Sequence, residues 1–390
     1  MPEEKPGIIL LNGGADFYGS GKILLEVARH LVQADFSVFV ILPHDGPIAP
    51  AFSEVGAQVK ILNLGILRRK YFNPIGLLTR MILWAYGLLT LGLYIRKNNI
   101  NIIYSNTLSV LIGSFLARLV KRPHIWHVHE ILPDTGIMAR FYRFWFRRTS
   151  SHFVAVSEAV KKRWVSLIQP PSTIEVIHNG LKYPEALRSD LNLRNELHLP
   201  PVSQLVGMVG RVHAGKGQDY LLDILHRLRE RLPDLHLIIV GDAYPGNEHL
   251  VDAMLAKVNE LGLEKRVHYL GYREDVSDIL LNLDLFILPS TLPDSFPTVI
   301  LEAMSHEIAV MATKSGGAEE MLEQDISGVL VPWDDVDLVA GEMESLLRNG
   351  DKRRAMAIAG RKRVRDRFSE TAFASRTVAN IREKLRNNEV

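Results

Sequence analysis

Short apolar runs alternate with amphipathic segments along nearly the whole chain, and this alternation limits the possible folds more than any other feature. Short, fully apolar runs are typical of parallel strands buried on both faces, and the segments between them have the 3.6-residue period of helices. The first runs are Ile8–Leu11, Val38–Leu42 and Val59–Leu62, and the pattern restarts at Leu205–Val209. Alternating strands and helices form parallel sheets covered by helices. The sequence therefore predicts an α/β fold with two such sheets.

The division into two halves follows from the length of the chain and from the position of the restart. At 390 residues the chain is longer than one ordinary domain, and a weakly patterned, proline-containing stretch precedes Leu205. We predict an N-terminal domain over 1–182, an interdomain connection over 183–204, a second domain over 205–368 and a C-terminal helix over 369–390 that packs back on one of the domains. The other expected strands are Ile102–Ser105, Ile125–His129, Phe153–Val156, Ile174–Ile177, Leu235–Val240, Val267–Leu270, Leu283–Leu288 and Ile308–Thr313.

A glycine-rich loop from Asn12 to Gly21 joins the first expected strand to the first helix. Glycines in such a loop imply close approach of the backbone to a ligand, or turns with positive φ. The loop is not a nucleotide P-loop, because Asp16 stands at the first required glycine and Ile23 at the required Ser or Thr. It is also a poor dinucleotide fingerprint, since Leu24 replaces the third glycine. A ligand-binding loop and a simple tight turn both stay open.

The stretch from Ser290 to Met304 follows an apolar run and leads into a helix whose first turn should contain Pro297. In open α/β sheets ligands bind at the carboxyl ends of strands, and a helix N-terminus favours an anion such as pyrophosphate. Asp294 precedes the helix, and Glu302 lies among apolar residues within it. Two carboxylates on either side of a helix N-terminus suit a nucleotide sugar, which has hydroxyls at both ends and phosphates in the middle. Alternatively, Asp294 caps the helix and Glu302 is solvated.

Two cations follow the first strand of the second half, in the loop Gly210-Arg211-Val-His-Ala-Gly-Lys216-Gly217. Arginine and lysine in a glycine-containing loop between a strand and a helix are suited to phosphate binding. The alternative interpretation is a flexible basic loop without a ligand.

Histidines and aspartates elsewhere suggest chemistry but have simpler explanations. Strand alternation places His127 and His129 on one face, with His129 nearer the carboxyl end where ligands bind; a structural histidine is the alternative. Asp335 and Asp337 could be taken for a metal-binding pair, but just before a helix they are better interpreted as a cap and a first-turn acid. We find no convincing metal cluster in the sequence.

Charge is distributed unevenly between the two halves. Residues 1–180 contain 20 Lys and Arg against 11 Asp and Glu, whereas residues 181–390 contain 26 against 33. No acidic residue occurs between Glu54 and Glu130. The first half therefore suits an anionic partner, which could be nucleic acid, an anionic membrane surface or a phosphorylated acceptor.

Cysteine content and the N-terminus indicate the compartment. The chain has no cysteine, which excludes disulfides and cysteine metal sites and fits a reducing compartment. The first residues are acidic, and the apolar run Gly7–Leu11 is too short for the core of a secretory signal. We expect a cytoplasmic protein.

A very apolar segment, Ile75–Ile95, is interrupted only by Arg80, so that its uncharged core is Met81–Ile95. That core is shorter than the ~20 residues needed to span a bilayer. It is either a helix buried in the first domain or an interfacial helix with Trp84, Tyr86 and Tyr94 near the headgroups. A second basic and aromatic segment, with Arg140, Arg143, Arg147 and Arg148, is either solvated or in contact with lipid or an anionic glycan.

Together these pieces resemble the retaining glycosyltransferases of family four, which have the GT-B fold of two Rossmann-like domains facing across a cleft. The resemblance covers nearly the whole chain, and it depends on the order and spacing of the motifs more than on any one of them. They are the glycine-rich first loop, Asn179-Gly180, Gly210-Arg211 with Lys216-Gly217, Pro289-Ser290, Asp294 to Glu302, and Gly316-Gly317 with Glu320. The family usually has Glu where this chain has Asp294, one methylene shorter.

The resemblance implies roles for individual residues. Arg211 and Lys216 would bind the donor pyrophosphate, Asp294 the transferred sugar and Glu302 the ribose hydroxyls, while His129 would lie beside the reacting sugar. Further donor contacts are implied for Gly14, Gly19, Gly271, Tyr272, Ser295, Phe296, Pro297, Thr298, Gly316 and Gly317, and acceptor contacts for Tyr18, Ser20 and Asn106.

The function implied is transfer of a hexosyl group from a UDP- or GDP-sugar to a saccharide or lipid-linked acceptor, with retention of configuration and without a metal. The basic first half suggests cell-envelope polysaccharide or glycoconjugate synthesis at the cytoplasmic face of a membrane. A nucleotide-sugar epimerase on the same fold and a non-catalytic binding protein for sugar nucleotides or nucleic acid are the alternatives. Nucleic acid is disfavoured, because the basic residues form no known reading motif and the second half is acidic.

Overall fold

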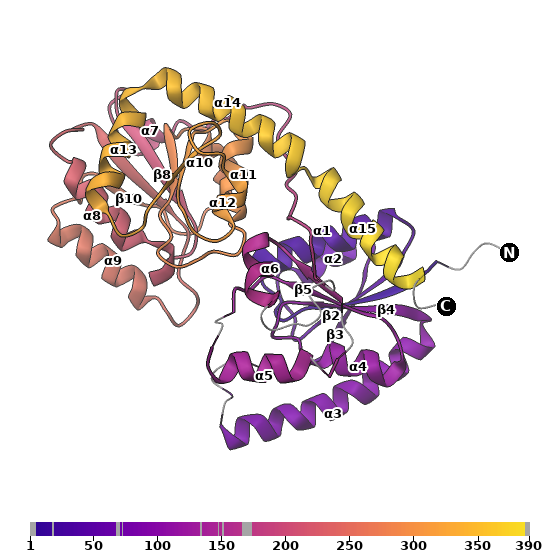
Figure 1. Cartoon of the computed structure of the whole chain (residues 1–390). Helices are drawn as coiled ribbons and strands as arrows, with labels where there is room; N and C mark the ends of the chain where they lie inside the picture. The colour runs from indigo at the N-terminus through magenta and orange to yellow at the C-terminus, as the bar shows by residue number, and fades with distance from the viewer. Residues whose placement is uncertain are drawn as a thin grey trace. The chain divides into compact units, whose positions relative to one another are not determined.

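The structure is a computed structural model that describes residues 5–17, 19–67, 71, 73–132, 135–146, 148–149, 152–165 and 174–386 (Figure 1). The chain forms two compact units. Unit 1 comprises Met1–Gly180 together with Glu370–Val390, and unit 2 comprises Leu181–Ser369. The C-terminal helix thus belongs to unit 1, and the stretch expected to connect the domains belongs to unit 2.

Unit 1 contains a parallel sheet of seven strands in the order β3-β2-β1-β4-β5-β6-β7. The central strands are buried on both faces because they are almost entirely apolar, as in the Gly-Ile-Ile-Leu-Leu sequence of β1. The strand order reverses between β1 and β4, which is the topological switch point where ligands bind in open α/β sheets. The strands are β1 (Gly7–Leu11), β2 (Ser37–Leu42), β3 (Gln58–Ile61), β4 (Ile100–Asn106), β5 (His124–Val128), β6 (His152–Ala155) and β7 (Ile174–Val176).

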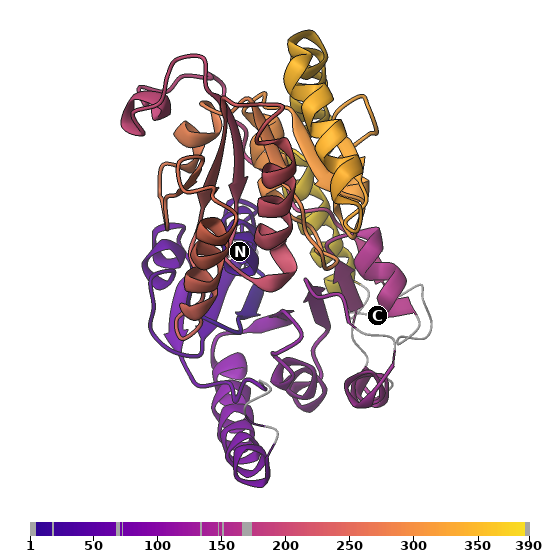
Figure 2. The same ribbon diagram turned by 90° about the vertical axis from the view of Figure 1, so that its left-hand side faces the viewer.

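Helices cover both faces of this sheet (Figures 1 and 2). One face packs against α1, α2 and α15, with Leu24, Phe52 and Phe373 in the shared core. The other face packs against α3 and α4, which contribute Leu91 and Leu116. The helices are α1 (Gly19–Gln33), α2 (Ala49–Glu54), α3 (Pro74–Lys97), α4 (Ile112–Val120), α5 (Ile137–Phe146), α6 (Glu158–Val165) and α15 (Glu370–Arg386).

Unit 2 contains a parallel sheet of six strands in the order β10-β9-β8-β11-β12-β13. This is the doubly wound arrangement of a Rossmann fold, and its switch point lies between β8 and β11. The strands are β8 (Gln204–Val209), β9 (Leu235–Val240), β10 (Val267–Tyr269), β11 (Leu285–Leu288), β12 (Val310–Thr313) and β13 (Val329–Val331). The helices are α7 (Leu193–Glu196), η3 (Ala214–Lys216), α8 (Gln218–Leu228), α9 (His249–Glu260), α10 (Val276–Leu280), α11 (Thr298–Ser305), α12 (Ala318–Met321), α13 (Val336–Arg348) and α14 (Gly350–Arg367).

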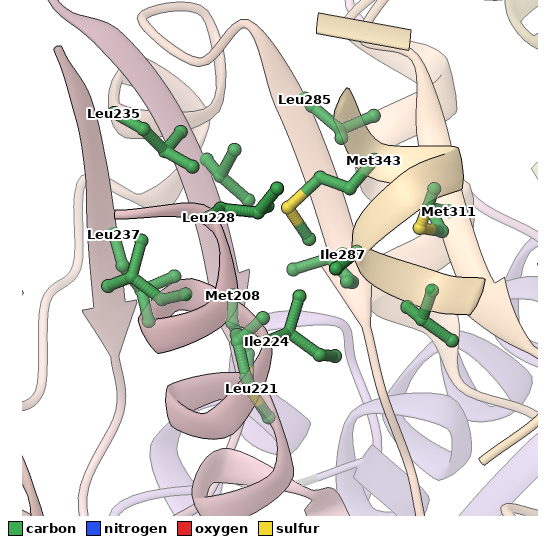
Figure 3. Packing of buried hydrophobic residues seen from close by; sticks show 14 of the residues in the cluster. Met208, Leu221, Ile224, Leu228, Leu235, Leu237, Leu285, Ile287, Met311 and Met343 are labelled. Atoms are coloured by element: carbon green, nitrogen blue, oxygen red, sulfur yellow. The ribbon is translucent and has the colours of Figure 1, made fainter. Parts of the chain in front are cut away.

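One face of the second sheet packs against α8 and α13 through interdigitated aliphatic side chains and methionines (Figure 3). Ile224 and Leu228 of α8 and Met343 of α13 pack against Met208 of β8 and Ile287 of β11, all of them almost completely buried. The strands adjoining the switch point are therefore held by a continuous core. The loops that follow these strands start from a rigid base.

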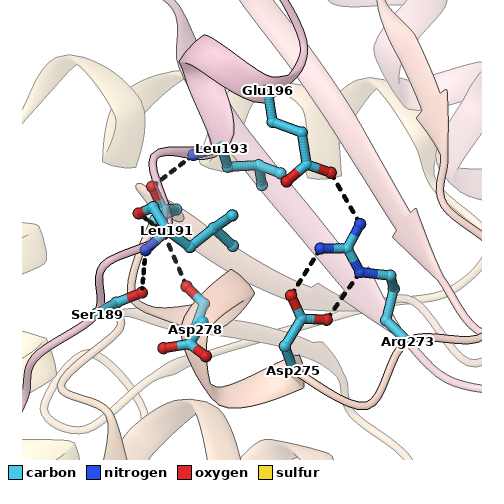
Figure 4. A network of polar contacts seen from close by, with 8 residues as sticks. Ser189, Leu191, Leu193, Glu196, Arg273, Asp275 and Asp278 are labelled. Carbon is cyan, nitrogen blue, oxygen red and sulfur yellow. Dashed lines mark hydrogen bonds and ion pairs between the residues drawn. The ribbon is translucent and has the colours of Figure 1, made fainter.

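The expected connection, residues 183–204, contains the short helix α7, which is fixed to unit 2. Leu193 is fully buried. Arg273 donates through Nη1 to Glu196 at 2.8 Å. Its Nε and Nη2 donate to the two carboxylate oxygens of Asp275 at 2.7 and 2.6 Å (Figure 4). A bidentate arginine of this kind fixes geometry as well as charge.

The interpretation of the apolar segment Ile75–Ile95 as a buried helix is wrong. It forms most of α3, and in the most apolar window of that helix only 17% of the residues are buried. The helix packs on unit 1 along one narrow side, where Gly76, Gly87, Leu91 and Ile95 are buried. The interpretation of Asp335 as a cap is confirmed, because its carboxylate accepts from the Leu338 amide at 2.9 Å at the start of α13.

Candidate active site

The loops after β8 and β11 meet at the switch point of unit 2. Lys216, at the end of the β8 loop, forms an ion pair and hydrogen bond with the carboxylate of Asp294 in the β11 loop. Both side chains are partly accessible, 31% for Lys216 and 19% for Asp294. The two residues are 78 positions apart in the chain. The fold therefore brings one cation and one anion of the predicted site into contact.

Glycines allow the loops around this pair to approach each other closely. Gly217 has a φ of +84°, and a Cβ there would lie 1.8 Å from the carbonyl oxygen of Pro289. Gly316 has a φ of +61°, and a Cβ there would lie 2.0 Å from the carbonyl oxygen of Asp294. The amide of Gly317 donates to that same carbonyl at 2.8 Å. The loops after β8, β11 and β12 thus form one interlocked layer, in which only glycine fits at positions 217 and 316.

The helix α11 starts without a side-chain cap. The helix begins at Thr298, so that Pro297 is its N-cap and does not lie in its first turn as predicted. The Ile300 amide donates to the Pro297 carbonyl at 3.0 Å. The other amides of a helix's first turn have no partner within the helix, and together with the helix dipole they favour an anion. The alternative role of Asp294 as the cap is therefore wrong, since its carboxylate pairs with Lys216 instead.

Glu302 is half-buried on α11, where Thr298 Oγ1 donates to Glu302 Oε1 at 3.3 Å. Phe296 is buried, with its ring 6.0 Å from that of Phe368, and Ser295 is half-buried. The segment between the two predicted carboxylates is therefore anchored in unit 2 by its aromatic side chain, which fixes the backbone on either side of it.

Arg211 lies over the ring of Tyr244, with its guanidinium carbon 3.7 Å from the ring centroid. A guanidinium stacked on a tyrosine ring is held in place without losing its hydrogen-bond donors. Gly271 and Tyr272 follow β10, and the carbonyl of Gly271 accepts from the Gly241 amide at 2.7 Å, while the Tyr272 side chain is exposed. Sequence reasoning missed Tyr244, whose only signal is its position shortly after a strand.

A buried chain of hydrogen bonds occupies the switch point of unit 1. Asn106 Nδ2 donates to Asn12 Oδ1 at 2.9 Å and to the Ser20 carbonyl at 3.0 Å, and Asn12 Nδ2 donates to the Gly14 carbonyl at 2.9 Å. Asn106 Oδ1 therefore faces His129 Nε2, 2.8 Å away, as an acceptor. Since a neutral imidazole carries one N–H, this contact assigns the proton to Nε2 and leaves Nδ1 as the acceptor.

Burial keeps His127 on β5 and His129 just after this strand uncharged. It lowers the pKa of His129 to about 3, and it lowers the pKa of His127 well below its ordinary value, with a smaller effect of the neighbouring His129. The rings of His127 and His129 are 4.3 Å apart, so the prediction that they share a face is confirmed. His129 is thus a neutral hydrogen-bonding group at the carboxyl end of the sheet.

The remaining predicted residues of unit 1 lie around this network. Gly14 accepts from Asn12, Gly19 is the first residue of α1, and the Ser20 carbonyl accepts from Asn106. Asn106 itself is fully buried, so contact with an acceptor would require the network to open. Tyr18 lies outside the described residues, and its predicted acceptor contact stays a prediction.

Glu130 is a further group that sequence reasoning missed. Burial raises its pKa to about 7, although its carboxylate accepts from the Leu108 amide at 2.9 Å and from the His129 amide at 3.1 Å. The Glu130 carboxylate therefore binds a proton more tightly in the folded protein than in the unfolded chain. The resulting stabilisation is complete below the unfolded pKa of 4.5 and is lost as the pH rises through about 7.

We expect this to appear as a pH-dependent stability difference between the wild type and Glu130→Gln. Buried histidines act in the opposite direction over part of the same range, because their lowered pKa values favour the folded state as the pH rises. The quantity to measure is therefore the wild-type unfolding free energy minus that of Glu130→Gln, by urea titration. It should fall between about pH 5 and pH 7.5. A difference that is constant over this range would contradict the raised pKa.

Comparison with known proteins places this site in a family. Two doubly wound units, each with polar residues at its switch point, define the GT-B class of fold. Residues 17–182 match the family described as Glycosyltransferase Family 4, and residues 190–363 match the family described as Glycosyl transferases group 1. The two matches together cover most of the chain, which belongs to the glycosyltransferases that these two families describe.

Individual relatives agree with this assignment. A D-inositol 3-phosphate glycosyltransferase of Corynebacterium urealyticum is 30% identical over 200 residues, which are 50% of this chain and 46% of the relative. The chain thus matches less than half the length of the first curated relatives. An alpha-maltose-1-phosphate synthase of Mycolicibacterium smegmatis is 26% identical, covering 71% of this chain and 77% of the relative. The structure of Anabaena HepE in complex with UDP and glucose has 25% identity and a TM-score of 0.81, covering 96% of this chain and 98% of that one.

Proposed function

We propose that this protein transfers a hexosyl group from a nucleotide diphosphate sugar to a hydroxyl of a saccharide or lipid-linked acceptor, with retention of configuration. The observation that carries the proposal is the Lys216–Asp294 pair beside the uncapped start of α11. A cation and an anion that satisfy each other in the free protein can each take a separate partner when a donor binds. Lys216 would turn to the diphosphate, and Asp294 to hydroxyls of the sugar.

The surrounding groups fit the rest of such a donor. First-turn amides of α11 would share the negative charge of the diphosphate with Lys216 and Arg211. Glu302, further along the same helix, would accept hydrogen bonds from the ribose hydroxyls, because its half-buried carboxylate carries acceptor oxygens on the helix that begins beside the diphosphate. Tyr244 would hold Arg211 in its stacked position until the phosphate binds.

In the proposed reaction the bond between the sugar anomeric carbon and the phosphate oxygen breaks, and the acceptor oxygen bonds to the same face of that carbon. The proton of the acceptor hydroxyl passes to an oxygen of the departing phosphate. Negative charge grows on that phosphate as the bond breaks, so Lys216, Arg211 and the α11 amides stabilise the transition state more than the ground state. Because these groups supply positive charge, no divalent metal is needed, and activity should persist in excess EDTA.

Of the two predicted donor classes, UDP- and GDP-sugars, we propose a UDP-hexose, which the ligands of one structural relative support. Anabaena HepE, whose structure is similar to this one over nearly the whole chain, was determined in complex with UDP and glucose. Two relatives are named a D-inositol 3-phosphate glycosyltransferase and an alpha-maltose-1-phosphate synthase, which supports a polar acceptor. We propose that His129 of unit 1 contributes a neutral hydrogen-bonding group, since burial keeps its pKa low.

Thermal-shift measurement with a panel of nucleotide sugars tests this proposal. A ligand that binds only the folded form stabilises it by about 2.7 kcal/mol when the ligand concentration is about 100 times its Kd. We expect UDP-glucose or another UDP-hexose to raise the Tm by several degrees, and GDP-mannose to raise it less. A panel without any stabilising nucleotide sugar would contradict the proposal.

The charge of unit 1 supports a proposal for the acceptor and the site of action. We propose a role in cell-envelope polysaccharide or glycoconjugate synthesis at the cytoplasmic face of a membrane, since the acid-free interval from 55 to 129 suits anionic surroundings. Chromatography of reaction products distinguishes this transferase from an epimerase. An epimerase would interconvert two nucleotide sugars without any acceptor.

A further inference from the structure

The outer side of α3 carries a long apolar stripe that no part of the described chain covers. Its residues recur every three or four positions and are each more than half exposed: Ile75, Leu78, Ile82, Tyr86, Leu89 and Leu93. Figures 1 and 2 show α3 as the outermost helix on its side of the unit 1 sheet. Contiguous apolar surface of this kind on a soluble unit marks an interaction site.

This helix is firmly attached to unit 1. Trp84 of α3 packs against Phe115 of α4 and Trp145 of α5, with ring centroids 6.3 and 5.8 Å away, and its indole N–H donates to the Gly65 carbonyl at 3.0 Å. Leu91, near the C-terminal end of α3, is fully buried in the sheet core. The stripe is thus the outer surface of a rigid three-helix layer.

The charges of the layer are all of one sign. The sequences of α3, α4 and α5 contain no Asp or Glu. Exposed cations occur on these helices and just beyond their ends: Arg96, Lys97, Arg118, Lys121, Arg122, Arg140 and Arg148. The neighbouring helices also expose apolar residues: Leu119 on α4 and Ile137 and Phe144 on α5.

We propose that this layer docks on an anionic lipid bilayer, with α3 lying in the interface parallel to the membrane surface. Apolar side chains of the stripe enter the acyl boundary, and the surrounding cations contact lipid phosphates. The charge favours this occupant over a second copy of the chain, because two such layers would bring like charges together. By length and composition alone α3 could cross a membrane, but its buried contacts with the sheet favour lying on the surface.

Vesicle flotation of the full chain tests the docking surface without any sugar donor. The protein should float with vesicles of phosphatidylcholine and phosphatidylglycerol, and less with phosphatidylcholine alone or at high salt. Ile82→Gln/Leu89→Gln should weaken this binding by at least about tenfold, since two exposed anchors are lost. Ile358→Gln is the matched control, because Ile358 is 51% exposed on a helix of unit 2, and it should float like the wild type.

Three flotation results would overturn the proposal: no flotation of the wild type, equal flotation of the wild type and the double variant, or flotation that depends on neither salt nor anionic lipid. Light scattering in solution supplies a further check, since a wild-type dimer that becomes monomeric in Ile82→Gln/Leu89→Gln would assign the stripe to a second copy. Docking does not depend on the proposed transferase function. The Tm shift with UDP-hexose should be equal in the wild type and the double variant, so failure of one proposal is distinguishable from failure of the other.

Discussion

Replacing Lys216 with alanine should lower kcat by about 10²–10³-fold, the usual effect of removing one charged or hydrogen-bonding group that stabilises a developing anion. The KM for the donor should rise as well, because the carboxylate of Asp294 would lose its partner and repel the diphosphate. Lys216→Arg keeps the charge and should recover part of the loss. Initial rates with a UDP-hexose and the acceptor measure both parameters.

Lys352→Ala is the control for this experiment. Lys352 also forms an ion pair in unit 2, with Asp325 at 3.2 Å, but this pair is largely exposed and contributes little. Its removal should leave kcat and KM unchanged. Wild-type turnover in Lys216→Ala would refute the assigned role of this residue.

Replacing Gly217 with alanine should destabilise unit 2 and abolish binding of the nucleotide. The new Cβ would lie 1.8 Å from the Pro289 carbonyl oxygen, at a φ of +84°. The left-handed backbone costs an alanine about 1–2 kcal/mol, and overpacking typically adds 1–3 kcal/mol. We expect the unfolding free energy to fall by about 2–5 kcal/mol in urea titrations. Relief of the clash would separate the β8 and β11 loops and move Lys216 away from Asp294.

Gly246→Ala separates the cost of the left-handed backbone from the cost of the steric clash. Gly246 has a φ of +88°, similar to that of Gly217, but a Cβ there would meet no atom within 4 Å. Only the backbone cost of about 1–2 kcal/mol should appear, and the Tm shift with UDP-hexose should be retained. Equal losses of stability in the two variants would contradict the close approach at Gly217.

The strands and the order of the loops could be predicted because they depend on local patterns. An apolar run such as Leu235–Val240 has no stable alternative to burial in a sheet, and the structure has β9 with these bounds. The helix α14 was not anticipated, because most of its residues are charged and only Met356, Ala357, Gly360 and Val364 are buried. Its position depends on packing against α11 and α13, which no local pattern encodes.

Contacts between distant residues could not be read from the sequence in the same way. The pairing of Lys216 with Asp294 follows from the parallel order of β8 and β11, and the sequence left the capping role of Asp294 open. The stacking of Arg211 on Tyr244 depends on two loops that follow neighbouring strands. Hydropathy predicted the helix at Ile75–Ile95, but it could not say which side of α3 the sheet would cover.

The structure of this protein bound to UDP tests the central claim most directly. Our account predicts that the diphosphate lies at the start of α11, with an oxygen within about 3 Å of Lys216 Nζ, Lys216 separated from Asp294, and the ribose hydroxyls on Glu302. UDP bound elsewhere, or bound with the Lys216–Asp294 pair still intact, would contradict the account.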